Sequence, residues 1–236
     1  GAFARRNPND IVFVAVAEPD EARRKEFCRD HGICPDNAVE DWHELLARPK
    51  MADCAFVCTQ DNQHIAPAMA ALQAGYHVVM EKPMSRHADE LRALKALAEE
   101  KGKLVTVCHV LRYTPFFSKV KELLDAGEIG QLQSVQQIEN VAYWHQAHSF
   151  VRGNWRREDE TSPMILAKSC HDMDIILWMV GSHCTKVPLS GVWDILKPRT
   201  HRRGHRNTAW TVARFPIPAR TMRNEFICKV KGFMCR

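Results

Sequence analysis

The sequence lacks several features that would each assign the protein to a particular class. No stretch is long and apolar enough to span a bilayer and no secretory signal is visible, so we expect no membrane partner. No Cys-x-x-Cys pair occurs, and we predict no zinc site or other metal site. The nine cysteines show no disulfide framework. Those in predicted helices or strands are interpreted as small core residues in a reducing compartment, which predicts a cytoplasmic protein.

The sequence does contain a regular alternation of short apolar runs with helical segments. The apolar runs, which are rich in β-branched residues, are Ile11–Ala17, Cys54–Cys58, His77–Met80 and Leu104–Cys108. The intervening helical segments are Glu21–His31, Asp41–Ala47, Gln63–Ala74 and Ala88–Lys101. Strands that are apolar on both faces and alternate with helices indicate a parallel sheet covered on both sides. We therefore predict an α/β fold with a doubly wound sheet.

The segment His77–Ser85 carries the most specific chemical signal. Its apolar run ends in Glu81, Lys82 and a proline, and Ser85 is placed to cap the next helix. Glu81 and Lys82 should therefore lie at the carboxyl-terminal edge of a buried strand, where open α/β sheets bind ligands. A lysine there can hold a substrate hydroxyl and favour its ionised form. The alternative is a solvated charge pair in a strand-to-helix turn.

Glu18 follows the first apolar run directly. An acid at the tip of the second strand of a dinucleotide-binding fold accepts hydrogen bonds from the adenosine ribose hydroxyls. The alternative is an acid at a helix N-terminus, favoured there by the helix dipole.

In combination these features resemble the Gfo/Idh/MocA family of NAD(P)-dependent oxidoreductases, over about residues 3–187. The resemblance is carried by Val14–Asp20, Val57–His64, Glu81–Pro83, Leu111–Pro115 and His171–Asp174. It implies a Rossmann-like domain followed by an α+β substrate domain. It also implies hydride transfer between a nicotinamide and a secondary hydroxyl of a sugar or cyclitol.

The resemblance assigns roles to individual residues. The lysine of the Glu-Lys-Pro motif, Lys82, is expected to lie near the nicotinamide and the substrate. The Thr59–His64 loop resembles the family's cofactor loop, with Gln60 and Asp61 in place of Pro and Asn. An acid at Glu18 repels a 2′-phosphate, so NAD is expected rather than NADP. The expected cofactor-binding residues are Glu18, Thr59, Asn62, His64, Glu81, Lys82 and Arg112.

A second cluster of candidate residues lies on the predicted helix 162–181. Ser162 and Pro163 resemble its N-cap and first residue, and Lys168, His171 and Asp172 share one face. His171 has a reference pKa of about 6.5, which suits it to take the proton of a hydroxyl. Lys82, His171 and Lys168 are therefore the predicted catalytic residues. The alternative is that His171 is only packed inside the helix interface.

The aromatic, histidine-rich run from Tyr143 to Trp155 is interpreted as a substrate loop. It could equally be a packing or oligomer surface, and we expect the parent protein to be a homo-oligomer. The expected substrate-binding residues are Tyr143, His145, His148, Trp155 and Asp172.

The chain also departs from the family pattern. It contains no G-x-G-x-x-G turn, whose amides would bind the pyrophosphate, and it begins as if the first strand were missing. We expect a partial dinucleotide-binding domain over 1–110 and the start of the substrate domain over 111–187. Leu132–Val141 is expected to be the first strand of that second domain.

Residues 188–236 differ from the rest in charge. They hold 11 Lys/Arg against 2 Asp/Glu, a net charge of +9, whereas the preceding residues carry −4. We predict a basic, disordered tail. A nucleic-acid arm is a possible reading of such charge, but we expect no nucleic-acid partner. The possible codons of the tail can be translated in a shifted frame that starts at the third base of each codon. The result can resemble the sequence with which family members continue beyond this point, so we hypothesise a one-base frameshift near Val187. The alternative is a natural basic tail.

Three functions remain open. The first is the NAD-dependent sugar or cyclitol dehydrogenase implied by the resemblance. The second is a redox-neutral glycosidase, in which bound NAD oxidises the sugar transiently. The third is an inactive remnant or a sugar-binding protein, which the missing phosphate turn favours for the chain as printed.

Overall fold

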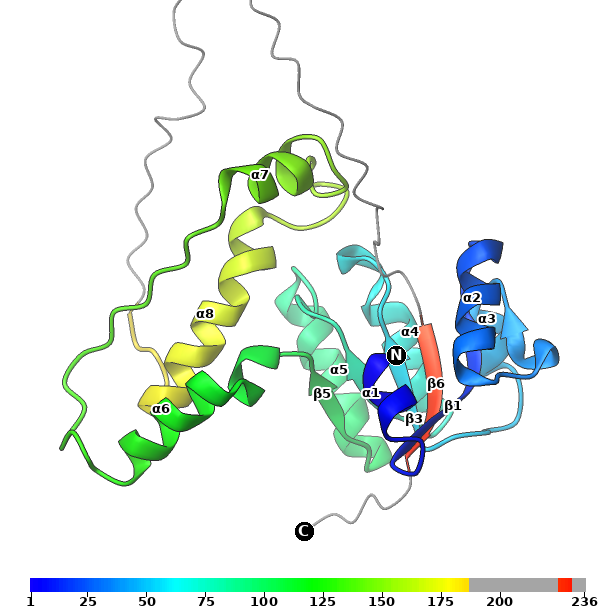
Figure 1. Ribbon diagram of the computed structural model, residues 1–236, viewed down its shortest axis with the longest axis horizontal. Coiled ribbons are helices and arrows are strands. Elements are labelled where there is room, and N and C mark those ends of the chain that lie inside the picture. Colours follow the sequence, from blue (N-terminus) through cyan, green and yellow to red (C-terminus); the bar gives the residue numbers. More distant parts are fainter. Residues whose placement is uncertain (187–224, 231–236) are drawn as a thin grey trace, which may run out of the picture.

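A six-stranded sheet forms the centre of the protein (Figure 1). The computed structural model describes residues 1–186 and the backbone of residues 225–230. The strands are β1 (Ile11–Ala17), β2 (Ala38–Val39), β3 (Cys54–Val57), β4 (His77–Met80), β5 (Val105–Val107) and β6 (Glu225–Val230). Their order in the sheet is β2-β1-β6-β3-β4-β5.

Pairing in the sheet is parallel except at its centre. Strand β1 pairs in parallel with β2, and β3, β4 and β5 pair in parallel in that order. Strand β6 lies antiparallel to both β1 and β3, with Ile227 opposite Ala15 on one side and Ala55 on the other. The four predicted parallel strands are thus confirmed within one residue at their ends, and the sheet is Rossmann-like.

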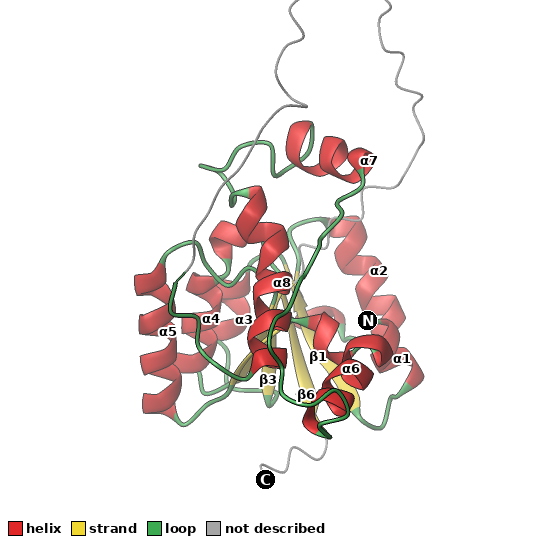
Figure 2. Ribbon diagram, turned by 90° about the vertical axis from the view of Figure 1, so that its left-hand side faces the viewer, coloured by secondary structure: helices red, strands yellow, loops and turns green. Residues whose placement is uncertain are grey.

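Helices cover both faces of the sheet (Figure 2). Helices α3 (Trp42–Leu46), α4 (Ile65–Gln73) and α5 (Ala88–Lys101) cover one face, and α1 (Ala2–Arg6) and α2 (Glu21–His31) cover the other. The strands supply both cores because alternate side chains point to opposite faces. Ala15 and Ala17 join the first core, which includes the fully buried Leu72 and Leu94, and Val16 joins the second.

Local signals account for the helix boundaries. Asp20 accepts a hydrogen bond from the Arg23 backbone N–H at 3.0 Å and so caps the start of α2. Helix α5 ends at Gly102, whose φ of +59° is a left-handed conformation that favours glycine. The predicted bounds of α2 and α5 are confirmed.

The remaining described helices follow the sheet domain along the chain. They are α6 (Pro115–Asp125), α7 (Tyr143–Gln146) and α8 (Met164–Val180), and α7 runs into a π-helical turn over Ala147–Val151. Helix α8 ends at Gly181, as the sequence predicts, but Ser162 is not its cap. The Ser162 hydroxyl instead donates to Asp61. No helix in residues 1–186 is long and apolar enough to cross a bilayer.

Two expectations differ from the structure. Leu132–Val141 forms no strand, and most of its residues are exposed. An isolated strand has no partner for its backbone N–H and C=O groups, and no other described segment pairs with these residues. Conversely, Glu225–Val230 lies in the predicted disordered tail yet forms strand β6. The rest of that tail, and the proposed frameshift position at Val187, lie outside the described residues.

Candidate functional site

A cavity of about 880 Å³ opens at the carboxyl ends of β1, β2 and β3. Three of the predicted cofactor-binding residues line it: Glu18 after β1, and Thr59 and Asn62 after β3. The carboxyl ends of parallel strands meet at one edge of a sheet, which explains why residues so distant in sequence converge here. The cavity therefore lies at the edge of the sheet where the sequence predicts that the adenosine ribose binds.

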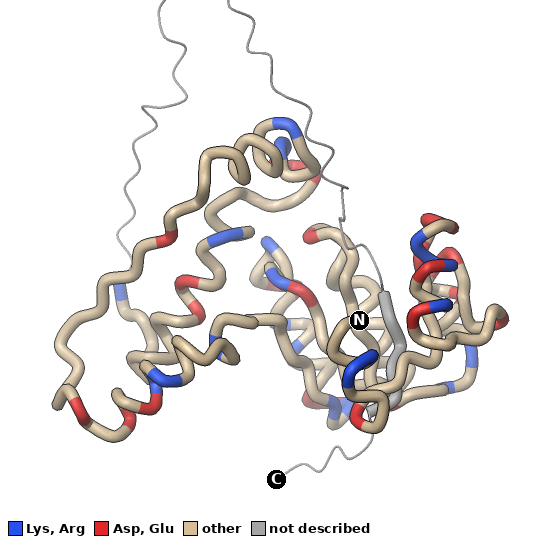
Figure 3. Tube along the Cα trace, in the orientation of Figure 1, with Lys and Arg blue, Asp and Glu red and all other residues tan. Residues whose placement is uncertain are grey.

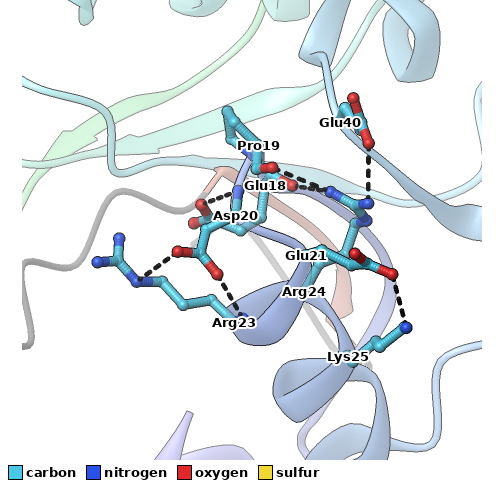
Figure 4. Close-up of polar contacts among 8 residues, drawn as sticks. All are labelled: Glu18, Pro19, Asp20, Glu21, Arg23, Arg24, Lys25 and Glu40. Carbon is cyan, nitrogen blue, oxygen red and sulfur yellow. Dashed lines mark hydrogen bonds and ion pairs between the residues drawn. The ribbon is translucent and has the colours of Figure 1, made fainter.

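Glu18 is held rigidly at the wall of this cavity (Figure 4). The side chain is only 2% exposed, and its Oε1 accepts a hydrogen bond from the Asp20 backbone N–H at 2.9 Å. Arg24 donates to the backbone carbonyl oxygen of Glu18 and pairs with Glu40 at 3.1 Å. These contacts fix the turn between β1 and α2, so the carboxylate is presented in one orientation.

The lining of the cavity is predominantly acidic. It includes the four carboxylates of Glu18, Asp20, Glu40 and Asp41 and the single guanidinium of Arg23. Carboxylate oxygens accept hydrogen bonds from hydroxyl groups and repel phosphate. The cavity thus suits a ribose with free hydroxyls.

The loop after β3 is held by the buried side chain of His64. His64 is 1% exposed, and its Nδ1 and Nε2 lie 2.8 and 3.0 Å from the carbonyl oxygens of Pro83 and Thr59. His64 therefore ties the loop to the turn that follows Lys82, and it does not line the cavity. The Thr59 hydroxyl is buried and has no hydrogen-bond partner within the described residues, so it is free for a ligand.

Asp61 anchors the predicted substrate loop to this edge of the sheet. Its Oδ2 accepts hydrogen bonds from the Trp155 indole N–H at 2.9 Å and from the Ser162 hydroxyl. Trp155 was predicted to bind substrate; its only polar group is instead engaged with Asp61. The neighbouring Asn154 lines the acidic cavity.

The three predicted catalytic residues meet where α8 approaches the end of β4. The Lys82 ammonium donates to the carbonyl oxygen of Ala167 on α8 at 3.0 Å. Lys168, the next residue, lies with its Nζ 2.9 Å from the Nε2 of His145. Figure 3 shows the corresponding basic positions on the N-terminal half of α8 and on the adjacent edge of the sheet domain.

The charges of these groups act on one another. Burial lowers the pKa of His171, and the positive charge of Lys82 and then of His109 lowers it further. Burial and the Lys82 charge also lower the pKa of Lys168. His171 is therefore a neutral base at neutral pH. Its Nδ1 is buried with no hydrogen-bond partner among the described residues.

The structure adds His109 to this group. His109 lies two residues after the end of β5, its ring centroid lies 5.9 Å from that of His171, and its Nδ1 is also buried without a described partner. The sequence signal was available, because His109 stands just past an apolar run, as Lys82 does.

Other predicted residues have different surroundings. Arg112, predicted to bind cofactor, makes two hydrogen bonds to Asp174 on α8, at 2.7 and 2.6 Å. It therefore fastens α8 to the segment after β5. Asp172 is buried and accepts a hydrogen bond from the Gln137 side chain at 2.9 Å.

The remaining candidates are Glu81, Tyr143 and His148. Tyr143 is 84% exposed and His148 is also exposed, so neither is enclosed with Lys82. Glu81 is half-buried beside Cys108. Burial and the Glu81 carboxylate raise the pKa of the Cys108 thiol to about 11. Within residues 1–186, no group of three or more His, Cys, Asp or Glu side chains could hold a metal ion.

Comparison with known proteins identifies the family. Residues 2–109 match the oxidoreductase family with an NAD-binding Rossmann fold, and residues 117–219 match the GFO/IDH/MocA C-terminal domain. The chain belongs to the Gfo/Idh/MocA oxidoreductase family, as the sequence motifs indicate. The second match includes Val187, and the frameshift near that residue stays a prediction.

Individual relatives agree with this assignment. The Bacillus subtilis (strain 168) protein YteT is 31% identical over 193 residues, which are 81% of this chain and 42% of YteT. The scyllo-inositol 2-dehydrogenase (NADP(+)) IolW of the same organism is 33% identical over 161 residues, 68% of this chain and 43% of IolW. This chain thus spans about two fifths of the length of these relatives.

A solved structure shows the same fold. Levoglucosan dehydrogenase in complex with NADH has a TM-score of 0.60 and 24% identity, covering 72% of this chain and 45% of that one.

Proposed function

We propose that the chain carries the ribose-binding and proton-transfer parts of an NAD-dependent dehydrogenase that acts on a secondary hydroxyl of a sugar or cyclitol. The observation that supports this most strongly is the hydrogen bond from Lys82, at the carboxyl edge of the sheet, to the Ala167 carbonyl oxygen on α8, the helix that carries Lys168 and His171. The activity belongs to the whole protein, which we propose to be a cytoplasmic homo-oligomer.

Lys82, His171 and Lys168 have separate roles in removing the proton from the hydroxyl. Lys82 stabilises the developing alkoxide with its positive charge. His171 accepts the proton, since its lowered pKa keeps the imidazole neutral. Lys168 assists by holding His145 beside the reacting group. When bound, the nicotinamide would supply the acceptor for the hydride.

The cofactor fits the site only in part. Glu18 and the unpartnered Thr59 hydroxyl suit the adenosine ribose, and the acidic lining supports NAD over NADP. No glycine-rich turn exists in the printed sequence to hold the pyrophosphate. In the described sheet the central position belongs to the antiparallel strand β6. We therefore expect the printed chain to bind NAD weakly.

Two alternatives stay open: a redox-neutral NAD-dependent glycosidase, and an inactive remnant or sugar-binding protein. The test is to incubate the protein, at the length its gene encodes, with NAD and a panel of sugars, cyclitols and glycosides. A dehydrogenase produces the absorbance of reduced nicotinamide. Glycoside cleavage without net absorbance change identifies the redox-neutral enzyme, and neither signal with any compound refutes both enzymatic functions.

A further inference from the structure

The two ammonium groups at the candidate site are not compensated by carboxylates. Lys82 donates to a backbone carbonyl and Lys168 lies against a neutral imidazole nitrogen, at 3.0 and 2.9 Å. Neither lysine forms an ion pair within residues 1–186, although most exposed Lys and Arg side chains of the sheet domain do.

The acids near this site are committed elsewhere. Asp174 is neutralised by its two hydrogen bonds from Arg112, and Asp172 accepts from Gln137 through Oδ1, whereas its buried Oδ2 has no described partner and forms no described ion pair with either lysine. Glu81 interacts with the Cys108 thiol. Glu139 is the one carboxylate whose charge raises the pKa of Lys168. It is exposed and forms no ion pair within residues 1–186.

No carboxylate in residues 1–186 forms an ion pair with either lysine, so an anion that enters with the ligand would relieve their mutual repulsion. Lys82 is the charge that acts most strongly on Lys168, and it opposes the protonated form. Lys168 also lies 5.7 Å from the ring centroid of Phe150, in a half-buried setting that weakens its solvation. A charge-assisted hydrogen bond is strongest where water is partly excluded.

We propose that Lys168, with Lys82 and His145, forms a subsite for a carboxylate, so that the substrate class is a sugar acid or cyclitol acid and not a neutral polyol. The proposal rests on the proposed function, because it places the carboxylate on the same ligand whose hydroxyl faces Lys82. A carboxylate can accept from both ammonium groups, and it is favoured over a phosphate because the guanidinium of Arg112 is already bound to Asp174.

The test measures binding to the full printed chain without NAD. Calorimetry compares D-glucuronate, D-glucose and glucose 6-phosphate at matched ionic strength, for the wild type and for Lys168→Met, Lys168→Arg and the surface control Lys95→Met. Lys95 is 78% exposed on α5, and within residues 1–186 its ion pair is with Glu99. Circular dichroism verifies that each variant is folded.

We expect D-glucuronate to bind about tenfold or more tightly than D-glucose, which is the scale of one charge-assisted hydrogen bond. Lys168→Met should abolish that difference, while Lys168→Arg and Lys95→Met should keep it. Equal binding of D-glucuronate and D-glucose, no binding of either, preference for glucose 6-phosphate, or an undiminished preference in Lys168→Met would each overturn the carboxylate subsite.

The outcomes separate this inference from the proposed function. If D-glucuronate binds through Lys168 but no compound reduces nicotinamide in the assay above, the subsite stands and the dehydrogenase function falls. If the enzyme reduces nicotinamide with a neutral polyol and D-glucuronate binds no more tightly than D-glucose, the dehydrogenase function stands and the carboxylate subsite falls.

Discussion

Asp61 offers the sharpest test of how the predicted substrate loop is held against the sheet. The residue is 8% exposed, and its Oδ2 receives the Trp155 indole N–H and the Ser162 hydroxyl. Replacing Asp61 by alanine leaves the buried Ser162 hydroxyl and the half-buried Trp155 indole N–H without this acceptor. The contacts span roughly a hundred residues of sequence, so their loss should release residues 149–162 from the sheet domain.

The magnitude follows from the two lost hydrogen bonds. A hydrogen bond to a charged group contributes about 1.5–3 kcal/mol, so losing two in Asp61→Ala should cost about 3–6 kcal/mol. That is a large part of the roughly 5–15 kcal/mol that stabilises a typical domain. Ser162→Ala alone should cost about 1.5–3 kcal/mol, but almost nothing once Asp61 has been removed, because its partner is already gone.

Urea unfolding gives the free energy of unfolding for each single variant and the double variant, and amide exchange shows whether protection is lost over 149–162. The matched control is Asp125→Ala, which removes an exposed aspartate paired with Lys121 and should change stability by no more than about 0.5 kcal/mol. The reasoning fails if Ser162→Ala costs the same with and without Asp61.

Three further results are expected. Because burial and the Lys82 charge lower the pKa of His171, the rate of hydroxyl oxidation should fall as the pH is lowered, with the midpoint of that fall below about pH 6.5. A midpoint above that pH would show that His171 is not the base. Glu18→Gln should raise the relative affinity for NADP over NAD, measured by calorimetry, and an unchanged ratio would refute the ribose role. Amide exchange should be slow over 225–230 and fast in Ile227→Pro, which removes a backbone donor of β6; exchange at the unprotected limit in the wild type would instead support the disordered, frameshifted tail.

Much of the sheet domain was predictable from local patterns. The ends of α2 and α5 follow from Asp20 and from glycines that adopt left-handed φ, and the strands follow from runs that are apolar on both faces. Lys82 was predictable as a site residue for a related reason, because the end of a buried parallel strand marks the ligand edge of the sheet.

What could not be predicted depends on partners distant in sequence. Strand β6 is specified by two neighbours more than 150 residues away, and no local period marks it. The roles of Arg112 and Trp155 depend on Asp174 and Asp61, which neither the family motif around Arg112 nor the aromatic run that ends at Trp155 reveals. Leu132–Val141 shows the converse: a strand-like sequence forms no strand where no described neighbour pairs with it.

The central claim is that Lys82 acts in the chemistry and not only in packing. The most direct test compares turnover and the NAD dissociation constant for wild type and Lys82→Ala, on the protein at the length its gene encodes and with the substrate found in the nicotinamide assay. The account predicts a turnover lower by about 10²–10⁴-fold, with NAD affinity nearly unchanged. Near-normal turnover in Lys82→Ala would show that the lysine only holds α8 through the Ala167 carbonyl, and would contradict the account.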